Sequence, residues 1–414
     1  MGLSRVFELM PLQFTLGPAD ETSLHPLWSD LESRADPSFF LSWDWIGTWL
    51  AESGIRPLVL TGRSSERPVL CGLLVPCKRS SPMLWSTHGL GLHTTGEPTQ
   101  DVITIEYNGF LVDREWVGRA EPEALAFLTR GITVSGQRRD EVHLKGVTSE
   151  YECFLPSSTL AHIASRKPSW RVDLASVRAS GRPYLQHISA NTRQQIRRAI
   201  RLYEKRGKLA AKWAADDVEA ARFLEGFKEL HQRYWTSRGE PGGFAYPFFE
   251  GFVRRLAQCC ILRGTIEMVE VSCGSEPIGY VCNFLYKGHV YAYQTGLRYD
   301  PDPKLKPGLV SHYLCIEHHL RRGAHTYDFM AGDARYKASL GEPGPEMLHL
   351  IVQRPTITLR TELALRRTKH KLDHLRQKAQ PLLERHRVGF RLQERGTADM
   401  DDPNQGREAL RSLE

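Results

Sequence analysis

The chain lacks the features that mark disulfide-rich, zinc-binding and membrane-spanning proteins. Its eight cysteines include no C-x-x-C pair and no matching histidine spacing, so neither a disulfide framework nor a zinc site is expected. No run of about eighteen apolar residues occurs, and the amino-terminal MGLSRVFELMPLQFTLGP has no unbroken apolar core of the signal-peptide kind. These absences predict a soluble, cytoplasmic protein without a metal and without a transmembrane segment.

The composition is that of an ordinary globular protein with a basic bias. The 414 residues are 41% hydrophobic and 25% charged, which leaves room for two or more domains. The net charge of +7 favours anionic partners without identifying one. Much of the excess positive charge lies near Arg197 and in the carboxyl-terminal quarter of the chain.

Residues 1–165 are predicted to form one α/β domain that contains no obvious catalytic motif. The aromatic-rich segment 38–52 predicts a helix buried against a sheet. Residues 121–130 predict a second helix, and strands are expected at 57–61, 69–77, 102–112 and 141–146. The glycine-rich segment 87–96 (THGLGLHTTG) predicts a surface loop, because no helix follows it.

Residues 166–355 are predicted to form a second α/β domain that begins with a basic helix. Ser189 is the expected cap of SANTRQQIRRAIRLYEKRGK, and Gly207 the expected end. Arg193, Arg197 and Arg201 recur at intervals of four on one face. Such a face suits RNA, a nucleotide phosphate or an acidic carrier, and equally a surface that is only solvated.

An antiparallel meander is expected to follow. Residues 216–238 and 246–259 predict two amphipathic helices, and the next three segments, 265–273, 278–286 and 289–297, predict consecutive antiparallel strands. A last strand is expected at 347–352. Residues 356–395 predict a basic carboxyl-terminal helix, and 396–414 a polar, disordered tail.

The segment 288–337 predicts a strand-helix-strand crossover with a binding site at its mouth. The strand 289–297 precedes a polar loop, a helix that opens at Pro307 and Gly308, and a second strand at 325–330. Ligands of such units bind beyond the carboxyl ends of the strands, where the helix begins.

The start of this helix is the candidate anion site. Free backbone N-H groups at a helix amino terminus attract phosphate, and Lys304 and Lys306 add two positive charges. Gly308 would let a ligand approach the backbone closely. The alternative is a plain loop with solvated lysines, because the chain has no complete P-loop or GxGxxG pattern.

The order of these elements resembles the GNAT acyltransferase fold. The segments SANTRQQIRRAIRLYEKRG, YAYQTGL, KLKPGLVSHYLCIEHHLRRG and YDFMAGDARYK, which span about residues 189–337, resemble the CelD (BcsL) acetyltransferases of cellulose biosynthesis. Those proteins are related to the FemAB peptidyltransferases. The resemblance implies an α+β fold with a mixed sheet, and by analogy with FemAB proteins a degenerate second GNAT-like unit in the amino-terminal domain.

The resemblance also implies acyl transfer from acetyl-CoA or another acyl-CoA to an amine or hydroxyl. In that fold the two crossover strands splay apart, and the pantetheine arm of the donor fits between them. The donor's pyrophosphate would lie at Lys306, Pro307, Gly308 and Leu309, close to Lys304. The usual GNAT pyrophosphate pattern, Gln or Arg, two residues, Gly, one residue, then Gly or Ala, is absent, which leaves the donor open.

Acyl transfer needs a base for the acceptor and an acid for the leaving thiolate. Asp333 is the expected base or acceptor-orienting carboxylate, and Lys337 its charge partner or an acceptor anchor. Asp328 is either catalytic or a structural carboxylate that caps the loop. Tyr293 is the expected leaving-group acid and Gln294 a positioning group.

Three functional hypotheses follow. The favoured one is an acyl-CoA-dependent N- or O-acyltransferase with a small-molecule or saccharide acceptor, in envelope polysaccharide or secondary-metabolite biosynthesis. The second is a FemAB-like transferase that uses aminoacyl-tRNA, motivated by the arginine face and the basic carboxyl-terminal segment. The third is a non-catalytic scaffold that retains the fold.

Overall fold

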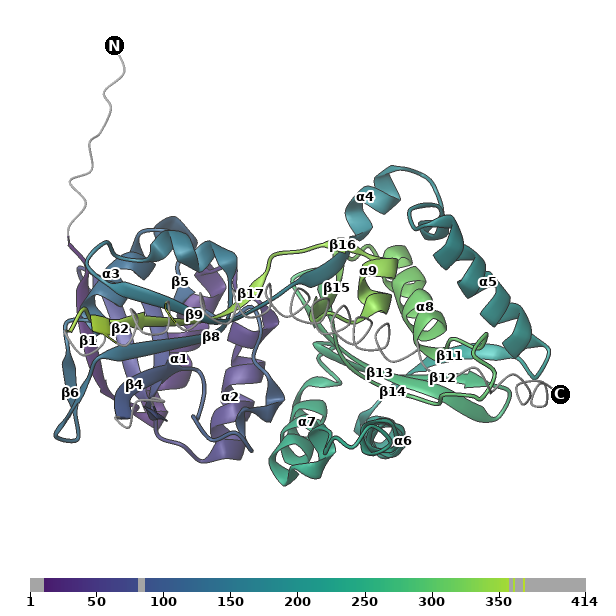
Figure 1. Ribbon diagram of the computed structural model, residues 1–414, viewed down its shortest axis with the longest axis horizontal. Coiled ribbons are helices and arrows are strands. Elements are labelled where there is room, and N and C mark those ends of the chain that lie inside the picture. The colour runs from purple at the N-terminus through teal and green to yellow at the C-terminus, as the bar shows by residue number, and fades with distance from the viewer. Residues whose placement is uncertain (1–10, 81–85, 357–359, 362–367, 369–414) are drawn as a thin grey trace, which may run out of the picture. The chain divides into compact units, whose positions relative to one another are not determined.

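Two mixed sheets organise the chain (Figure 1). The computed structural model describes residues 11–80, 86–356, 360, 361 and 368, and residues 1–354 and 355–414 form two separate units. The predicted helix at 356–395 and tail at 396–414 lie outside the described residues, apart from isolated positions. No helix in the described part of the chain has both the length and the apolar character that a membrane span requires.

The first sheet has the strand order β1-β2-β3-β4-β8-β17-β9, with β5 paired to β3. Its strands are β1 (Gln13–Pro18), β2 (Leu58–Ser64), β3 (Arg67–Ser80), β4 (Ser86–Leu92), β5 (Leu111–Val112), β8 (Glu141–Thr148), β9 (Leu160–Lys167) and β17 (Met347–Gln353). The helices and the small hairpin of this part are α1 (Glu21–Arg34), α2 (Trp43–Ser53), α3 (Ala120–Leu128), β6 (Ile132–Val134) and β7 (Gln137–Arg139).

The second sheet has the order β11-β12-β13-β14-β15-β10-β16. Its strands are β10 (Ser169–Asp173), β11 (Leu209–Trp213), β12 (Ile266–Cys273), β13 (Glu276–Tyr286), β14 (His289–Leu297), β15 (Thr326–Ala331) and β16 (Glu342–Pro343). Its helices are α4 (Leu174–Ala179), α5 (Ala190–Glu204), α6 (Asp217–Thr236), α7 (Pro247–Cys260), α8 (Pro307–Arg321) and α9 (Arg335–Leu340). Short 3-10 helices lie between these elements, namely η1 (Phe39–Leu41), η2 (Asp101–Ile103), η3 (Arg114–Trp116), η4 (Ser149–Phe154), η5 (Tyr184–Gln186) and η6 (Gly243–Ala245).

The two sheets repeat one plan. In the first, β1 to β4 form an antiparallel meander, and β4 then pairs in parallel with β8 at residues 89–91 and 141–143. In the second, β11 to β14 form the meander, and β14 pairs in parallel with β15 at residues 289–291 and 326–328. Helix α3 lies in the first crossover and α8 in the second. The predicted second, related unit is therefore visible in the strand order.

The strand predicted at 347–352 exists, but it joins the first sheet. β17 pairs with β8 on one side and with β9 on the other, although the sequence places it at the end of the second domain. In Figure 1 the chain returns from the second sheet to reach this position. The reason is that β8 and β9 leave a gap between them that only a further strand can fill.

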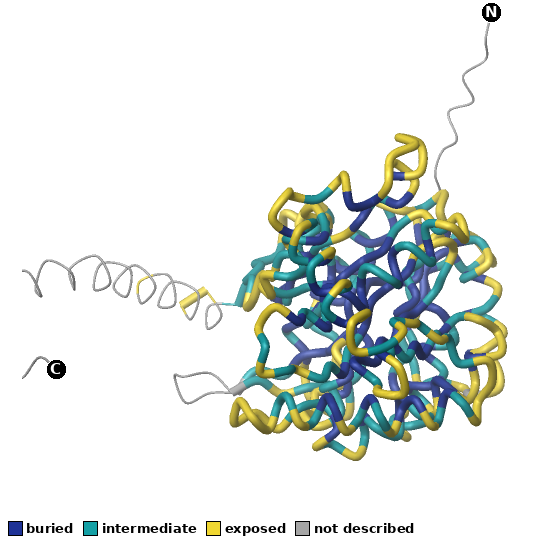
Figure 2. Tube along the Cα trace, turned by 90° about the vertical axis from the view of Figure 1, so that its right-hand side faces the viewer, coloured by how far each residue is buried: buried dark blue, intermediate teal, exposed yellow. Residues whose placement is uncertain are grey.

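One hydrophobic core joins the two sheets. Trp45 of α2 packs edge-on against Phe252 of α7, at 4.7 Å between ring centroids, and Phe39 stacks on Phe284 of β13 at 4.5 Å. Figure 2 shows that buried residues fill the interior. The predicted burial of the aromatic helix is confirmed, since Trp45 and Trp49 are 1% and 2% exposed. Burial of such rings contributes a large share of the stability.

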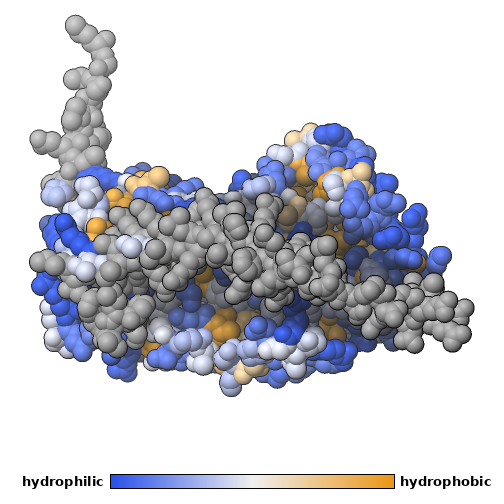
Figure 3. All heavy atoms as spheres, in the orientation of Figure 1, coloured by the Kyte–Doolittle hydropathy of each residue, from blue (hydrophilic) through white to orange (hydrophobic). Residues whose placement is uncertain are grey.

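Helix α5 begins where the sequence predicts. The hydroxyl of Ser189 accepts a hydrogen bond from the Thr192 N-H and caps the helix. Arg197 and Arg201 are exposed, whereas Arg193 is half-buried and donates to the Leu185 carbonyl. Figure 3 shows mostly hydrophilic residues in the region of α5.

Two predictions in the first domain are wrong. Residues 87–96 are not a surface loop, because most of them form β4 within the sheet. The glycines serve close packing there, since a Cβ at Gly89 would lie 3.1 Å from the Glu141 carbonyl oxygen. Residues 102–112 are not one strand, because only Leu111–Val112 is extended in a sheet. The rest is the end of η2 followed by a loop in which Thr104 and Tyr107 have positive φ angles of 48°.

Candidate active site

The crossover strands β14 and β15 separate after a short contact. Their parallel pairing covers His289 to Tyr291, and within the described chain no further pair joins them. The register between β13 and β14 shifts so that Cys282 faces Gln294 while Asn283 faces Ala292, which leaves Tyr293 as a bulge residue. A bulge re-aims the strand and frees main-chain groups from the ladder. The predicted splay is therefore present.

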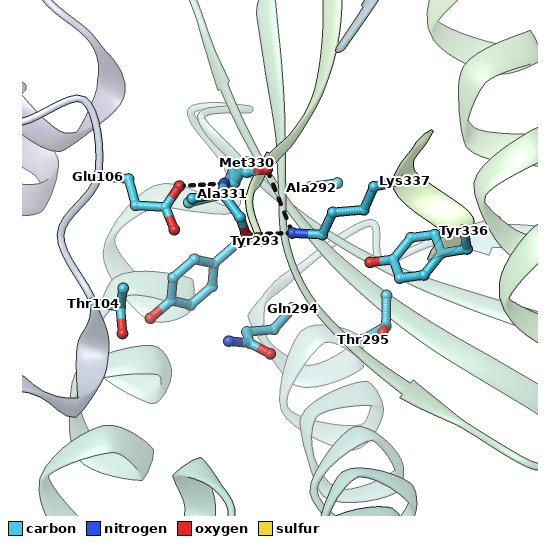
Figure 4. A pocket seen from close by; sticks show the side chains of 10 residues that line it. All are labelled: Thr104, Glu106, Ala292, Tyr293, Gln294, Thr295, Met330, Ala331, Tyr336 and Lys337. Carbon is cyan, nitrogen blue, oxygen red and sulfur yellow. Dashed lines mark hydrogen bonds between the residues drawn. The ribbon is translucent and has the colours of Figure 1, made fainter. Parts of the chain in front are cut away.

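A pocket of about 160 Å³ opens at this separation (Figure 4). It is lined by both strands, by α9 and by a loop of the first domain, through Thr104, Glu106, Ala292, Tyr293, Gln294, Thr295, Met330, Ala331, Tyr336 and Lys337.

The first domain supplies a carboxylate to this pocket. Glu106 lies on the loop that follows η2, and its Oε2 accepts a hydrogen bond of 2.7 Å from the Ala331 N-H at the end of β15. The loop is held by Asn108, whose amide donates to the carbonyls of Leu92 and Lys145, at 3.0 and 2.9 Å. The loop is thus fixed to the first sheet and presents Glu106 to the second.

Burial makes Glu106 a carboxyl group that titrates near neutrality. Glu106 is only 8% exposed, and this desolvation raises the pKa of its carboxyl group to about 7. Lys337 lies on the other side of the pocket, where its Nζ donates to the Ala331 carbonyl at 2.6 Å. Burial lowers the pKa of Lys337 below its ordinary value. The pocket therefore contains one group suited to accept a proton and one suited to donate a proton.

Asp328 does not line the pocket, but it ties the two domains together. Its Oδ2 accepts a hydrogen bond of 2.5 Å from the Tyr107 hydroxyl, and its Oδ1 accepts one of 2.6 Å from the Met330 N-H. Burial raises the pKa of Asp328 to about 6. Met330 has a positive φ of 62°, a strained conformation that an unbranched residue keeps only when its surroundings enforce it. Asp328 thus holds the turn that directs Ala331 toward Glu106.

The start of α8 provides backbone donors that have no side-chain cap among the residues that the structure describes. Pro307 occupies the first turn, and no described side chain caps the helix. The Val310 N-H donates to the Lys306 carbonyl at 3.0 Å. The N-H groups of Gly308 and Leu309 precede this hydrogen bond in the chain and so have no carbonyl of an earlier helical turn to bond. A Cβ at Gly308 would lie 3.1 Å from Leu297, so the helix start packs against the end of β14. The helix start lies at the carboxyl end of the strand that lines the pocket.

The structure brings together part of the predicted site. Lys337, Tyr293 and Gln294 line the pocket, although the Tyr293 hydroxyl is already engaged as a donor to the Ile103 carbonyl at 2.6 Å. Asp328 is buried and does not line it. Asp333, the expected base, is exposed and does not line this pocket. Lys304 is exposed and Lys306 half-buried, next to Pro307, Gly308 and Leu309 at the helix start.

Glu106 was not among the predicted residues. It lies in a run of alternating apolar residues that suggested a strand, and its partner Ala331 is far away in the sequence. The one available signal was an acidic residue between Ile105 and Tyr107, but a strand would place it on the polar face with Thr104 and Asn108, where it needs no special explanation.

Comparison with known proteins identifies the fold. Residues 190–338 match the family model described as an acetyltransferase (GNAT) domain. Among solved structures, FemX is 10% identical, with a TM-score of 0.50 over 83% of this chain and 97% of that chain. A tandem GNAT protein from the clavulanic acid biosynthesis pathway is 13% identical, with a TM-score of 0.42 over 83% of this chain and 99% of that chain.

A third structure, L-PGS from Bacillus licheniformis, is 9% identical, with a TM-score of 0.47 over 85% of this chain and 97% of that chain. No curated protein matches the chain. The resemblance to CelD (BcsL) proteins stays a prediction. The chain has a mixed α/β fold of the GNAT type and carries a GNAT-type acetyltransferase domain at residues 190–338.

Proposed function

We propose that this protein is an acyltransferase that transfers an acyl group from acetyl-CoA or another acyl-CoA to an amine or hydroxyl. The observation that carries the proposal is the pocket between β14 and β15, which Glu106 and Lys337 line and which opens where the parallel pairing of the two strands has ended. The acceptor we infer is a small molecule or saccharide of envelope polysaccharide or secondary-metabolite biosynthesis. This acceptor class rests on the sequence resemblance. The place of action is the cytoplasm, where acyl-CoA is made.

The donor fits along the gap. Its pantetheine arm lies beside β14 beyond Tyr291 and takes the place of a strand, bonded to main-chain groups that β15 no longer reaches. Its pyrophosphate lies at the start of α8, where the N-H groups of Gly308 and Leu309 and the charges of Lys304 and Lys306 favour an anion.

The transfer step uses one carboxylate and one ammonium group. The acceptor nitrogen or oxygen attacks the thioester carbonyl carbon, and its proton passes to the Glu106 carboxylate. The tetrahedral oxyanion is stabilised by main-chain N-H groups near the Tyr293 bulge. The C-S bond then breaks, and the departing thiolate takes a proton from Lys337, whose lowered pKa favours its release. Asp333 stays proposed as an acceptor-orienting carboxylate and Gln294 as a positioning group. Lys337 takes the role of leaving-group acid that was expected of Tyr293, because the Tyr293 hydroxyl donates to the Ile103 carbonyl.

Calorimetry with acetyl-CoA and longer acyl-CoAs tests the donor. We expect wild-type protein to bind, and the double variant Lys304→Ala/Lys306→Ala to bind about 2- to 30-fold more weakly, since each charge pair near the surface contributes about 0.2–1 kcal/mol. The matched control is Lys78→Ala/Arg130→Ala, which removes two exposed charges from the first domain. Absence of binding to every acyl-CoA would overturn the proposal.

A second candidate, transfer from aminoacyl-tRNA, is favoured by one observation. Arg197 and Arg201 are exposed on one face of α5 and have no ion-pair partner within the described residues. This function predicts tRNA binding that weakens steeply with salt and with Arg197→Ala/Arg201→Ala. Undetectable tRNA binding at low salt would remove it. Turnover by wild-type protein with either donor excludes a purely structural role.

A further inference from the structure

A cluster of metal-ligating side chains lies away from the pocket. Glu267 of β12 and the adjacent His318 and His319 of α8 place one carboxylate oxygen and two ring nitrogens within 4.8 Å of one another. None of these residues lines the pocket between β14 and β15. The Glu267 side chain is 11% exposed and that of His319 is 1% exposed, so the group is largely shielded from water.

The two histidines have nitrogens that nothing in the described chain satisfies. Nε2 of His318 and Nε2 of His319 are both buried and have no hydrogen-bond partner among the described residues. Nε2 of His319 lies 3.1 Å from Oε2 of Glu267, yet the pair is not aligned as an N-H···O bond. A buried polar nitrogen without a hydrogen-bond partner destabilises the folded protein. A ligand held between these atoms would remove that destabilisation.

The separation between the His319 and Glu267 ligand atoms suits a metal ion. Two ligands of a tetrahedral zinc ion, each about 2.0–2.1 Å from the metal, lie about 3.3 Å apart. The 3.1 Å between His319 Nε2 and Glu267 Oε2 is close to this spacing. A metal between them would explain why the two atoms approach without forming a hydrogen bond.

A neighbouring side chain fixes the ligands. The indole Nε1 of Trp213 donates to Glu267 Oε2 at 3.1 Å, and the Trp213 ring stacks on the His318 ring with 3.7 Å between centroids. Outer partners of this kind orient the ligands of metal sites. His319 also lines a pocket of about 290 Å³ with Lys287, His289 and other residues.

We propose that Glu267, His318 and His319 form a site for a divalent transition metal, with zinc the best fit and water in the remaining position. Two imidazoles and one carboxylate form a recognised zinc ligand set. The ion would join the second half of α8 to β12 and so stabilise the helix whose first turn holds the proposed donor site. The spacing of cysteines and histidines could not reveal it, because Glu267 lies on a separate element.

The test is titration of chelator-treated, full-length protein with Zn²⁺ alone, read by calorimetry and by thermal unfolding. We expect one saturable site and a melting temperature that rises with Zn²⁺ concentration, as for any ligand of the folded state. Glu267→Gln, which keeps an acceptor for Trp213, and His318→Gln should each weaken binding about tenfold or more. His187→Gln, an exposed histidine elsewhere, should bind like wild type.

Cobalt substitution separates this site from the free cysteines. Co²⁺ at the proposed ligands should give a visible absorption without the thiolate charge-transfer band that cysteine ligation produces, and the band should be lost in Glu267→Gln. The proposal is overturned if no saturable binding occurs, if thiolate ligation is seen, or if the variants bind as wild type does. Because these readouts need no acyl donor, they are independent of the proposed transferase function.

Discussion

A single buried carboxyl group determines how the proposed chemistry responds to substitution. Replacement of Glu106 by Gln keeps an acceptor for the Ala331 N-H but removes the base. We expect kcat to fall about 10²–10⁴-fold, the usual contribution of a positioned general base. The measurement is steady-state thiol release from acetyl-CoA. Asp333→Asn is the matched comparison, because Asp333 is the exposed carboxylate that the sequence predicts as the base. A larger loss of kcat in Asp333→Asn than in Glu106→Gln would assign the role of base to Asp333.

The pH dependence follows from the same residue. The carboxylate of Glu106 must be ionised to accept a proton, and burial raises its pKa to about 7. We therefore expect kcat/KM to increase with pH up to about 7 and then to level off. At higher pH it should fall as Lys337, whose pKa is lowered, loses its proton. The rise should vanish in Glu106→Gln, and a profile that is flat from pH 5 to 8 in wild type would contradict the assignment.

At the scale of elements, the shape of the loop that carries Glu106 depends on one glycine. Gly146 of β8 has φ of 76°, and a Cβ there would collide with the Ile105 carbonyl oxygen and lie 3.2 Å from the Glu106 Cα. The loop therefore packs directly against the backbone of Gly146, and the Asn108 N-H donates to the Gly146 carbonyl at 2.9 Å. Any side chain at position 146 must displace the loop that carries Glu106.

Gly146→Ala is therefore expected to reduce kcat by tenfold or more while leaving acyl-CoA binding within about twofold of wild type, since a small misplacement of a catalytic group is costly. The measurements are steady-state kinetics and calorimetry. Gly136→Ala is a suitable control, because it also has positive φ, 74°, but nothing lies within 4 Å of its added Cβ. Equal effects of the two substitutions would show that strain alone is responsible.

The contrast between this loop and α8 explains which elements the sequence could predict. Helices such as α5 and α8 have local signals, a Ser189 cap and a Pro307 start, and the meander β12 to β14 has regular turns. The segment 102–112 alternates apolar and polar residues as a strand does, but its conformation is set by Gly146 and Ala331, which are distant in the sequence. Local patterns carry no information on such contacts.

The same limit holds for the site. Lys337, Tyr293 and Gln294 could be predicted because they belong to the crossover unit itself. Glu106 could not, because the partner that brings it to the pocket lies in the other sheet.

At the scale of the molecule, the two sheets share one core and should unfold together. Trp45 of the first domain contacts Phe252 and Phe284 of the second. Trp45→Ala is expected to reduce the free energy of unfolding by about 3–5 kcal/mol. Far-ultraviolet circular dichroism and tryptophan fluorescence should still report one coincident urea transition. Two separate transitions in wild type would show that the domains are independent.

The position of β17 has a consequence for biosynthesis. While a ribosome is still translating the second sheet, β8 and β9 have emerged without the strand that lies between them. Their main-chain edges are open to unintended pairing until residue 353 has left the exit tunnel. The nascent protein therefore cannot mature domain by domain from its amino terminus, and prematurely terminated products that lack only the last strand should be chaperone clients.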